Sequence, residues 1–397
     1  MSTSRSRLRI AIIGAGMIGR AHAHAFRSLR EFFQPAPADV DLALVVDADA
    51  ALARDAQERF GFERTAASWQ DAVEARDIDV AVVALPNHQH REVVEALIAR
   101  GKHVLCEKPL AVNLSDAQAM LRAARRAGVV HGVGYNLRRA PAVAAIQRAV
   151  ARGDFGEPWQ FSGRYFTDYA ASPEVPFTWR YRRILAGGGA LADVGSHLID
   201  LGRFLLGEIE TVQGAMLATF IGRRPVPAEH AVGHARVATT GEFREVDTDD
   251  VASFTARFRN GTVADFHISR IATGYRNSPA FELIGSRASA AFDMERAGEF
   301  EFFDATREGE VNGPCRVVVG PGHPHFGNVS VLPVAGAGYG YTETYMIQAY
   351  EFVRAVLGQT PGYVPSFEDG CAVAHVVDAV QRSATDGRLV SIERISE

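Results

Sequence analysis

Two short segments carry side chains suited to chemistry. In Gly187–Asp200, the residues Asp193, His197 and Asp200 are spaced i, i+4 and i+7, so they would share one stripe of a helix. An acidic–imidazole–acidic stripe beside three glycines favours a site, and an ordinary surface face is the alternative. In the second segment, Lys108 stands between an acid and a proline at the end of an apolar strand. There it would point into a ligand cleft, and a surface charge pair explains the spacing equally well.

A third segment, Gly14–Gly19, has the glycine spacing of a dinucleotide-binding loop. It directly follows an apolar strand and opens a helix, which is the context that this motif requires. Gly14 would allow the tight turn, Gly16 the approach of a pyrophosphate, and Gly19 close packing of helix on strand. The helix N-terminus would offer its N–H groups to the phosphates. A glycine-rich turn that binds nothing is the less favoured interpretation.

Asp47 ends the second apolar strand, where a carboxylate can accept hydrogen bonds from the adenosine ribose. A carboxylate there repels a 2′-phosphate, and the following residues 48–50 include no arginine, so NAD is expected, with NADP the less favoured cofactor. A helix cap for the stretch from Ala50 is a second possible role of Asp47. The predicted cofactor-binding residues are Gly14, Gly16, Met17, Ile18, Gly19, Asp47, Pro86, Asn87, His90, Glu107 and Lys108.

No metal site is expected. The histidine pairs at 22/24, 88/90 and 323/325 each lack a third ligand nearby. The three cysteines, Cys106, Cys315 and Cys371, are odd in number and far apart, so they form neither a disulfide framework nor a metal knuckle.

The elements that must position these residues fall into two groups. Up to about residue 134, short apolar runs alternate with helical patterns, as in a doubly wound parallel sheet. From 135 to 397 the pattern is mostly consecutive strands with glycine turns, including Asn260-Gly261, which indicates an open, largely antiparallel sheet. The sequence therefore predicts a Rossmann domain (1–134) and an α+β domain (135–397). Residues 189–206 are expected to form one long helix, and the Gly/Pro-rich stretch 307–341 a functional loop.

Length and composition exclude several other classes. The chain has 397 residues and a net charge of −5, so a broad nucleic-acid or anionic-membrane footprint is not expected. No apolar run approaches the roughly 20 residues of a membrane span. The short apolar run after the charged N-terminus has no cleavage site, and a cytoplasmic location is expected.

Taken in order, the glycine loop, Glu107-Lys108-Pro109 and the Gly187–Asp200 segment resemble the Gfo/Idh/MocA oxidoreductases. The resemblance covers essentially the whole chain, and the last two motifs are far more specific than the glycines. Loop sequences further resemble family members that oxidise anhydrosugars; these are 35–37, 86–90, 135–139, 176–180, 323–324, 338–341 and Glu343.

The resemblance implies an NAD-dependent dehydrogenase that oxidises a ring secondary hydroxyl of a sugar or anhydrosugar, at the third carbon, to a 3-keto sugar. It also implies that Lys108, Asp193 and His197 are catalytic. The 135–397 domain would then be the substrate-binding and oligomerisation domain, with its open sheet joining the chains of a homodimer or homotetramer. His197 suits the general base, and Lys108 would stabilise alkoxide charge. Which of the two takes the proton stays open. Candidate substrate-binding residues are Lys108, Tyr135, Arg138, Tyr165, Tyr169, Trp179, Arg180, Asp193 and His197.

Three other functions remain open at this stage. The chain could oxidise an inositol or another cyclitol, or it could be a glycosidase that recycles NAD through transient oxidation. A nucleotide- or sugar-sensing protein is the non-enzymatic alternative. The presence of Lys108, Asp193 and His197 together argues against a sensor.

Overall fold

The chain divides into two compact units. The first comprises Met1–Arg139, Asn328–Val331 and Thr342–Cys371, and the second Ala140–Gly327, Leu332–Tyr341 and Ala372–Glu397. This computed structural model describes residues 6–228, 233, 237–310, 312–329, 332–359 and 364–393. The N-terminal residues 1–5 and positions 311, 330 and 331 of the expected 307–341 loop lie outside the described residues.

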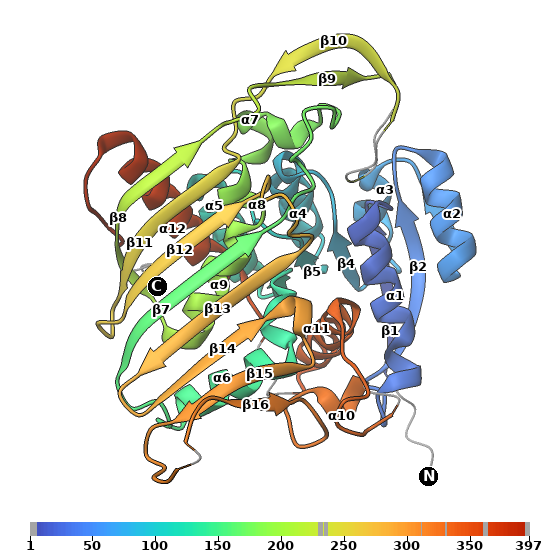
Figure 1. The fold of residues 1–397 in the computed structure, drawn as a ribbon. Helices are drawn as coiled ribbons and strands as arrows, with labels where there is room; N and C mark the ends of the chain where they lie inside the picture. Colours follow the sequence, from blue (N-terminus) through green and yellow to red (C-terminus); the bar gives the residue numbers. More distant parts are fainter. Residues whose placement is uncertain are drawn as a thin grey trace. The chain divides into compact units, whose positions relative to one another are not determined.

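The first unit contains the expected parallel sheet, with six strands in the order β3-β2-β1-β4-β5-β6 (Figure 1). The strands are β1 (Arg7–Ile13), β2 (Asp39–Val46), β3 (Arg64–Ala66), β4 (Val80–Val83), β5 (His103–Cys106) and β6 (His131–Val133). β4 is buried at all four positions, which is why its sequence is a continuous apolar run. The prediction of a doubly wound parallel sheet is confirmed, and β3 is a short strand that the sequence analysis missed.

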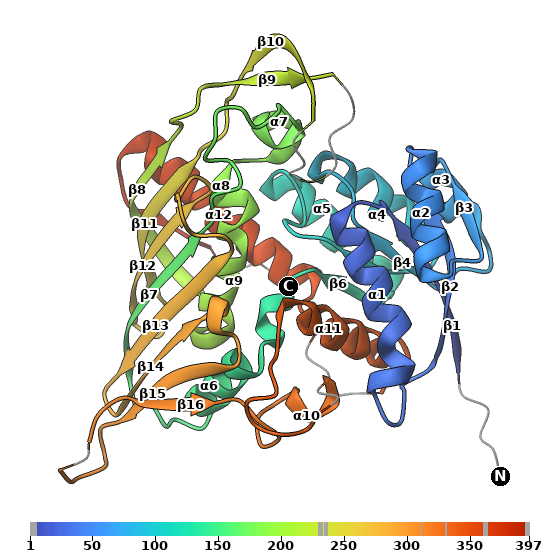
Figure 2. The same ribbon diagram turned by 45° about the vertical axis from the view of Figure 1, so that its right-hand side comes forward.

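Helices cover both faces of this sheet, α1 and α2 on one and α3, α4 and α5 on the other (Figure 2). The helices are α1 (Met17–Phe32), α2 (Ala50–Phe60), α3 (Trp69–Glu74), α4 (His90–Ala99) and α5 (Leu114–Ala127), with the 3-10 turns η1 (Asn87–Gln89) and η2 (Asn136–Arg139). Two later helices, α11 (Tyr341–Val356) and α12 (Phe367–Asp386), contribute residues to this unit. Tyr350 of α11 stacks on Phe33 at the end of α1, with ring centroids 4.0 Å apart.

The second unit is built on a nine-stranded sheet, ordered β16-β15-β14-β13-β7-β12-β11-β8-β17. Its strands are β7 (Pro158–Phe166), β8 (Ile209–Ala218), β11 (Val251–Phe258), β12 (Val263–Ser269), β13 (Ser278–Gly285), β14 (Ala288–Asp293), β15 (Glu299–Asp304), β16 (Cys315–Val318) and β17 (Val390–Ser391). Only the β12–β7 pair is parallel among these described pairings, so the expectation of a mostly antiparallel sheet is confirmed.

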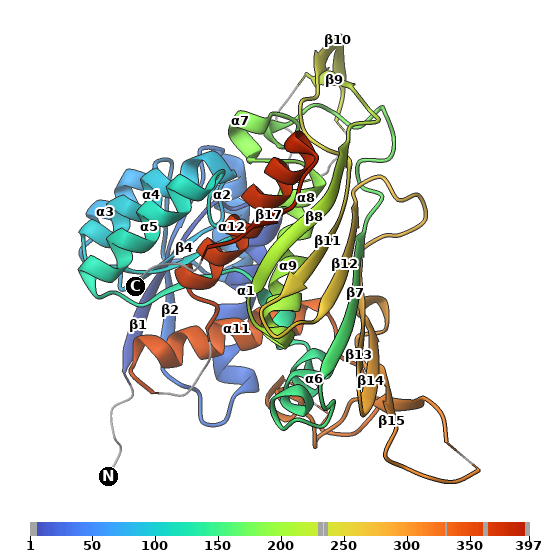
Figure 3. The same ribbon diagram turned by 90° about the vertical axis from the view of Figure 1, so that its left-hand side faces the viewer.

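The helices of the second unit include α6 (Pro141–Ala151), α7 (Arg183–Ala186), α8 (Ala190–Asp193) and α9 (Gly195–Leu206), with the 3-10 turns η3 (Trp179–Tyr181) and η4 (Met294–Arg296). Of these, α6, α8 and α9 cover one face of the sheet (Figure 3). The long helix expected over 189–206 is therefore wrong in detail, because it is divided at Val194 into α8 and α9.

Three further elements depart from the sequence analysis. A separate hairpin pairs β9 (Arg223–Pro227) with β10 (Thr239–Glu245). Within the stretch expected to be a loop, β16 joins the large sheet and α10 (Phe326–Val329) forms a short helix. None of the helices in the described ranges is both long and apolar enough to cross a membrane.

Candidate active site

The glycine loop of the first unit has the geometry of a pyrophosphate cradle. Gly14 adopts a φ of 104°, and a Cβ there would lie 2.4 Å from the carbonyl oxygen of Ala84. A Cβ on Gly19 would lie 1.8 Å from the carbonyl oxygen of Gly14, so both positions require glycine. Gly16 has open space on its Cβ side and is the N-cap of α1, which has no acidic residue in its first turn. The loop thus leaves room beside the N-terminus of α1, and its binding of the cofactor phosphates stays a prediction. Met17 and Ile18 begin the helix beside it.

Asp47 lies where β2 ends and bonds to the glycine loop. Its Oδ2 accepts from the Ala15 N–H at 2.8 Å, and its Oδ1 accepts from the Asp49 N–H at 2.9 Å. The alternative role as the helix cap belongs to Asp49, which caps α2 by accepting from Ala51 and Leu52. Each oxygen of Asp47 keeps a lone pair for a ribose hydroxyl, so these residues fit NAD.

The segment Pro86–His90 follows β4 at the same edge of the sheet. Its last residue, His90, is fully buried, with Nε2 2.9 Å from the Leu85 carbonyl and Nδ1 3.1 Å from the Pro109 carbonyl. Burial lowers the pKa of His90, and the carbonyl groups of Leu85, Leu110 and Pro109 act in the opposite direction. His90 therefore connects the loop after β4 to the loop after β5, and a direct role in binding the cofactor stays a prediction.

Lys108 follows β5 at this edge and is half-buried. The peptide bond to Pro109 is cis. The neighbouring Glu107 is only 5% exposed and accepts from His22 Nε2 at 2.8 Å and from the Lys108 N–H at 3.1 Å. The structure thus brings Lys108, Glu107 and the glycine-loop helix together within one unit.

Tyr135 and Arg138, which were predicted to bind the substrate, lie in the interior of the first unit. Tyr135 is 1% exposed, and Arg138 is fully buried with its Nη2 3.0 Å from Oδ1 of Asp369. Asp369 lies far along the chain, so no local spacing could have indicated this ion pair. A role of either residue in substrate binding stays a prediction.

In the second unit, Asp193 ends α8 and His197 lies in the first turns of α9, where it is 3% exposed. Asp249 fixes the start of α8, because its carboxylate accepts from the N–H groups of Gly189 and Leu191 at 2.7 and 2.8 Å. A Cβ on Gly189 would lie 1.8 Å from the Asp249 carbonyl oxygen, which explains a glycine at this position.

Two of the predicted tyrosines lie beside these residues. The Tyr169 hydroxyl donates to Oδ2 of Asp193 at 2.8 Å. Burial, and the charge of Asp193, raise the pKa of Tyr169 well above its usual value, so the hydroxyl stays a donor. Tyr165 donates to Asn277 at 2.8 Å, and its ring centroid is 6.1 Å from that of His197. The structure therefore brings together four of the predicted residues, Tyr165, Tyr169, Asp193 and His197.

The segment that carries Tyr169 rests on an interior cluster that sequence reasoning missed. Tyr181 lies between two guanidinium groups, that of Arg224 at 4.3 Å and that of Arg270 at 4.8 Å from the ring centroid. Arg270 pairs with the buried Asp250 at 2.8 Å, and Arg224 donates to backbone carbonyls of the Tyr169 segment. These partners are distant in sequence and form no motif. Trp179 and Arg180 precede Tyr181 and contact each other, with the guanidinium 4.4 Å from the ring centroid.

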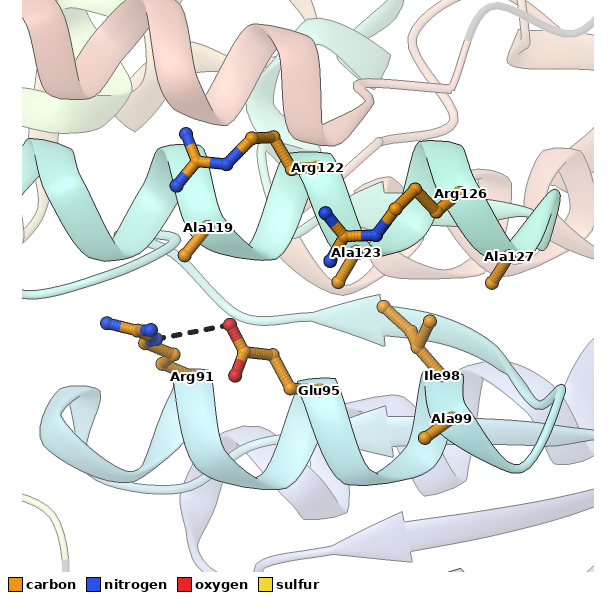
Figure 4. Close-up of a pocket in the computed structure, with 9 residues that line it drawn as sticks. All are labelled: Arg91, Glu95, Ile98, Ala99, Ala119, Arg122, Ala123, Arg126 and Ala127. Carbon is orange, nitrogen blue, oxygen red and sulfur yellow. Dashed lines mark hydrogen bonds and ion pairs between the residues drawn. The ribbon is translucent and has the colours of Figure 1, made fainter.

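A groove of about 620 Å³ between α4 and α5 contains none of the predicted site residues (Figure 4). Alanines line it, and Arg91 pairs with Glu95 within it at 3.1 Å. Among the described residues, no group of three or more His, Cys, Asp or Glu side chains could hold a metal ion.

Comparison with known proteins agrees with this geometry. Residues 8–135 match the oxidoreductase family with an NAD-binding Rossmann fold, and residues 143–291 match the GFO/IDH/MocA C-terminal domain. Levoglucosan dehydrogenase of Pseudarthrobacter phenanthrenivorans is 37% identical over 98% of this chain and 99% of its own length. Inositol 2-dehydrogenase of Rhizobium meliloti is 29% identical over 97% of this chain and 99% of its own. A solved levoglucosan dehydrogenase in complex with NADH and levoglucosan superposes with a TM-score of 0.91 at 36% identity, covering 98% and 100% of the two chains.

These matches confirm the family and the NAD-binding fold that the motifs implied. The loop segments led to an expected likeness to levoglucosan dehydrogenase, and the match over the whole chain confirms that likeness. The chain belongs to the Gfo/Idh/MocA family of NAD-dependent oxidoreductases.

Proposed function

We propose that this enzyme oxidises the secondary hydroxyl at the third carbon of levoglucosan or a closely related pyranose to a ketone. The observation that carries the proposal is the end-to-end similarity to levoglucosan dehydrogenase, in sequence and in fold. NAD, when bound, accepts the hydride from the carbinol carbon. The remaining steps fall to this chain's own side chains.

Lys108, at the end of β5, is proposed to hydrogen-bond the reacting oxygen and to stabilise negative charge as it develops there. His197 is proposed to take the hydroxyl proton. Asp193, held by Tyr169 at 2.8 Å, would orient the imidazole or bind a neighbouring hydroxyl. The partly exposed Trp179 and Arg180 are proposed to contact the sugar through an aromatic face and a planar set of donors.

The test is a spectrophotometric screen of the purified protein with NAD or NADP against levoglucosan, glucose, other pyranosides and inositols. We expect NADH to accumulate with levoglucosan and NAD. The 3-keto product would then be identified by borohydride reduction and sugar analysis. Faster turnover of inositols would replace this proposal with cyclitol oxidation, which similarity to inositol 2-dehydrogenase also supports. Glycoside cleavage without NADH accumulation would indicate a glycosidase that recycles NAD. NAD binding without turnover of any substrate would indicate a sensor.

We also propose a cytoplasmic homodimer or homotetramer that assembles through the large sheet. The face opposite α9 exposes apolar side chains on three strands, Met216, Val263 and Ile284, at 68%, 44% and 39%. Light scattering on the eluting protein would measure the mass. Charged substitutions at Met216 and Ile284 should shift an oligomer toward monomer.

A further inference from the structure

One buried hydrogen bond in the first unit connects the helix of the glycine loop to the segment that carries Lys108. His22 of α1 lies with its Nε2 2.8 Å from Oε1 of Glu107, and their side chains are 1% and 7% exposed. The two residues are far apart in sequence and meet in the interior. A buried carboxylate is costly unless its oxygens receive hydrogen bonds, so His22 is an essential donor for Glu107.

The other oxygen of the same carboxylate holds the backbone at Lys108. Oε2 accepts from the Lys108 N–H at 3.1 Å. The carboxylate also lies against Gly134, after β6, where a Cβ would be 2.6 Å from Oε1. Glu107 therefore has little room to adopt another rotamer, and its position determines where the Lys108 backbone begins.

His22 is itself fixed from a second direction. Its ring meets the ring of Tyr345 edge to face, with centroids 5.1 Å apart and planes at 88°. Nδ1 is buried and has no hydrogen-bond partner among the described residues. An imidazole protonated on Nε2 alone fits these surroundings, because it donates to Glu107 and leaves no N–H group unsatisfied.

We propose that His22 is a positioning residue for Lys108, acting through Glu107. The sequence of contacts runs from α1, through His22 Nε2 and the two oxygens of Glu107, to the Lys108 N–H. It aligns the lysine with the helix whose N-terminus receives the cofactor phosphates. The inference rests on the proposed function, because it assigns Lys108 to the reacting oxygen.

The test compares two similar polar substitutions. In His22→Gln the amide nitrogen can occupy the place of Nε2 and still donate to Glu107, whereas in His22→Asn it stays near the place of Nδ1 and falls short. We expect kcat with levoglucosan to fall about 10- to 100-fold in His22→Asn, as for a displaced catalytic group. In His22→Gln it should stay within about threefold of the wild type. The dissociation constant for NAD, by calorimetry, should be unchanged in both. His24→Asn, at an exposed histidine of the same helix, is the matched control.

A second readout does not depend on activity. Hydrogen–deuterium exchange at the Lys108 amide should become about tenfold faster in His22→Asn than in His22→Gln, since that amide loses a fixed acceptor. Equal exchange in the two variants, or a loss of NAD affinity that accounts for the lost kcat, would overturn the positioning role. If the wild type turns over no sugar, the proposed function fails and the exchange comparison alone decides whether His22 positions Lys108. Melting temperatures of both variants establish that they fold.

Discussion

The Lys108 segment of the first unit and the Asp193–His197 helices of the second are supported in different ways. Lys108 depends on a buried carboxylate, which receives hydrogen bonds from an imidazole and from the lysine's own N–H. Asp193 is itself the carboxylate, and it accepts from the neutral hydroxyl of Tyr169. Lys108 is therefore positioned through the carboxylate of its neighbour Glu107. Asp193 is positioned through Tyr169, whose own segment must in turn be held in place.

The support of that tyrosine segment reaches further along the chain. Arg224, from the β9–β10 hairpin, donates to Ala170 and Ser172 at 2.6 and 3.0 Å. Arg270 reaches the same cluster from the end of β12. The comparison indicates that the position of Lys108 depends on a few residues in and near its own motif. The position of Asp193 can be disturbed by substitutions at many points of the chain.

Replacement of Lys108 should have the largest effect. Lys108→Ala is expected to lower kcat at least about a thousandfold, because it removes both a hydrogen-bond donor and a positive charge at the reacting oxygen. NAD affinity, by calorimetry, should stay nearly constant. Lys108→Arg keeps the charge but cannot release a proton, so partial activity would assign proton transfer to His197. Undiminished turnover in Lys108→Ala would remove the lysine from the mechanism.

Sequence reasoning predicted the fold of the first unit well, and its candidate site residues follow strands directly. In a parallel sheet the carboxyl ends of strands meet at one edge, so Gly14, Asp47 and Lys108 come together by topology alone. Their helix and strand neighbours are also close in sequence, as with the cap of α2 at Asp49.

The second unit was harder to predict, for a physical reason. Helical spacing placed Asp193 and His197 near each other, but Tyr169, which bonds to Asp193, and Asp249, which holds the start of α8, come from distant parts of the chain. The break at Val194 is followed directly by Gly195, the first residue of α9, a signal that the sequence analysis did not use. In the first unit, the ion pair of Arg138 with Asp369 could not be predicted for the same reason, since its partners come from distant segments.

The two arginines around Tyr181 should differ in their contribution to stability. Arg270→Met would leave Asp250 buried without its cation, and we expect a loss of about 3–5 kcal/mol in the free energy of unfolding. Arg224→Met leaves only backbone carbonyls unpaired, so about 1–3 kcal/mol is expected. Urea unfolding of both variants measures the difference. Equal losses in the two variants would mean that the ion pair of Arg270 with Asp250 does not add to the contribution of Arg270.

Tyr169→Phe tests the support of Asp193 directly. The ring is kept and the hydrogen bond to Oδ2 is lost, so kcat should fall about tenfold, in keeping with a bond to a charged acceptor. Tyr350→Phe, which removes a hydroxyl from the ring stacked on Phe33, is the matched control and should be fully active. A fall in both variants would point to a general effect on the fold.

The smallest expected effect is on how the free energy of unfolding changes with pH, and it comes from buried tyrosines of the second unit. Burial raises the pKa of Tyr165, Tyr169 and Tyr181, all in the second unit. Above about pH 10 the unfolded chain releases these protons while the folded protein retains them. The unfolded state then binds fewer protons, so the free energy of unfolding falls as pH rises, until the folded tyrosines ionise. Each tyrosine contributes up to about 1.4 kcal/mol per pH unit, and Tyr169→Phe should remove one such share. Parallel pH profiles for the variant and the wild type, measured by urea unfolding, would show that Tyr169 ionises as easily in the folded protein as in the unfolded chain.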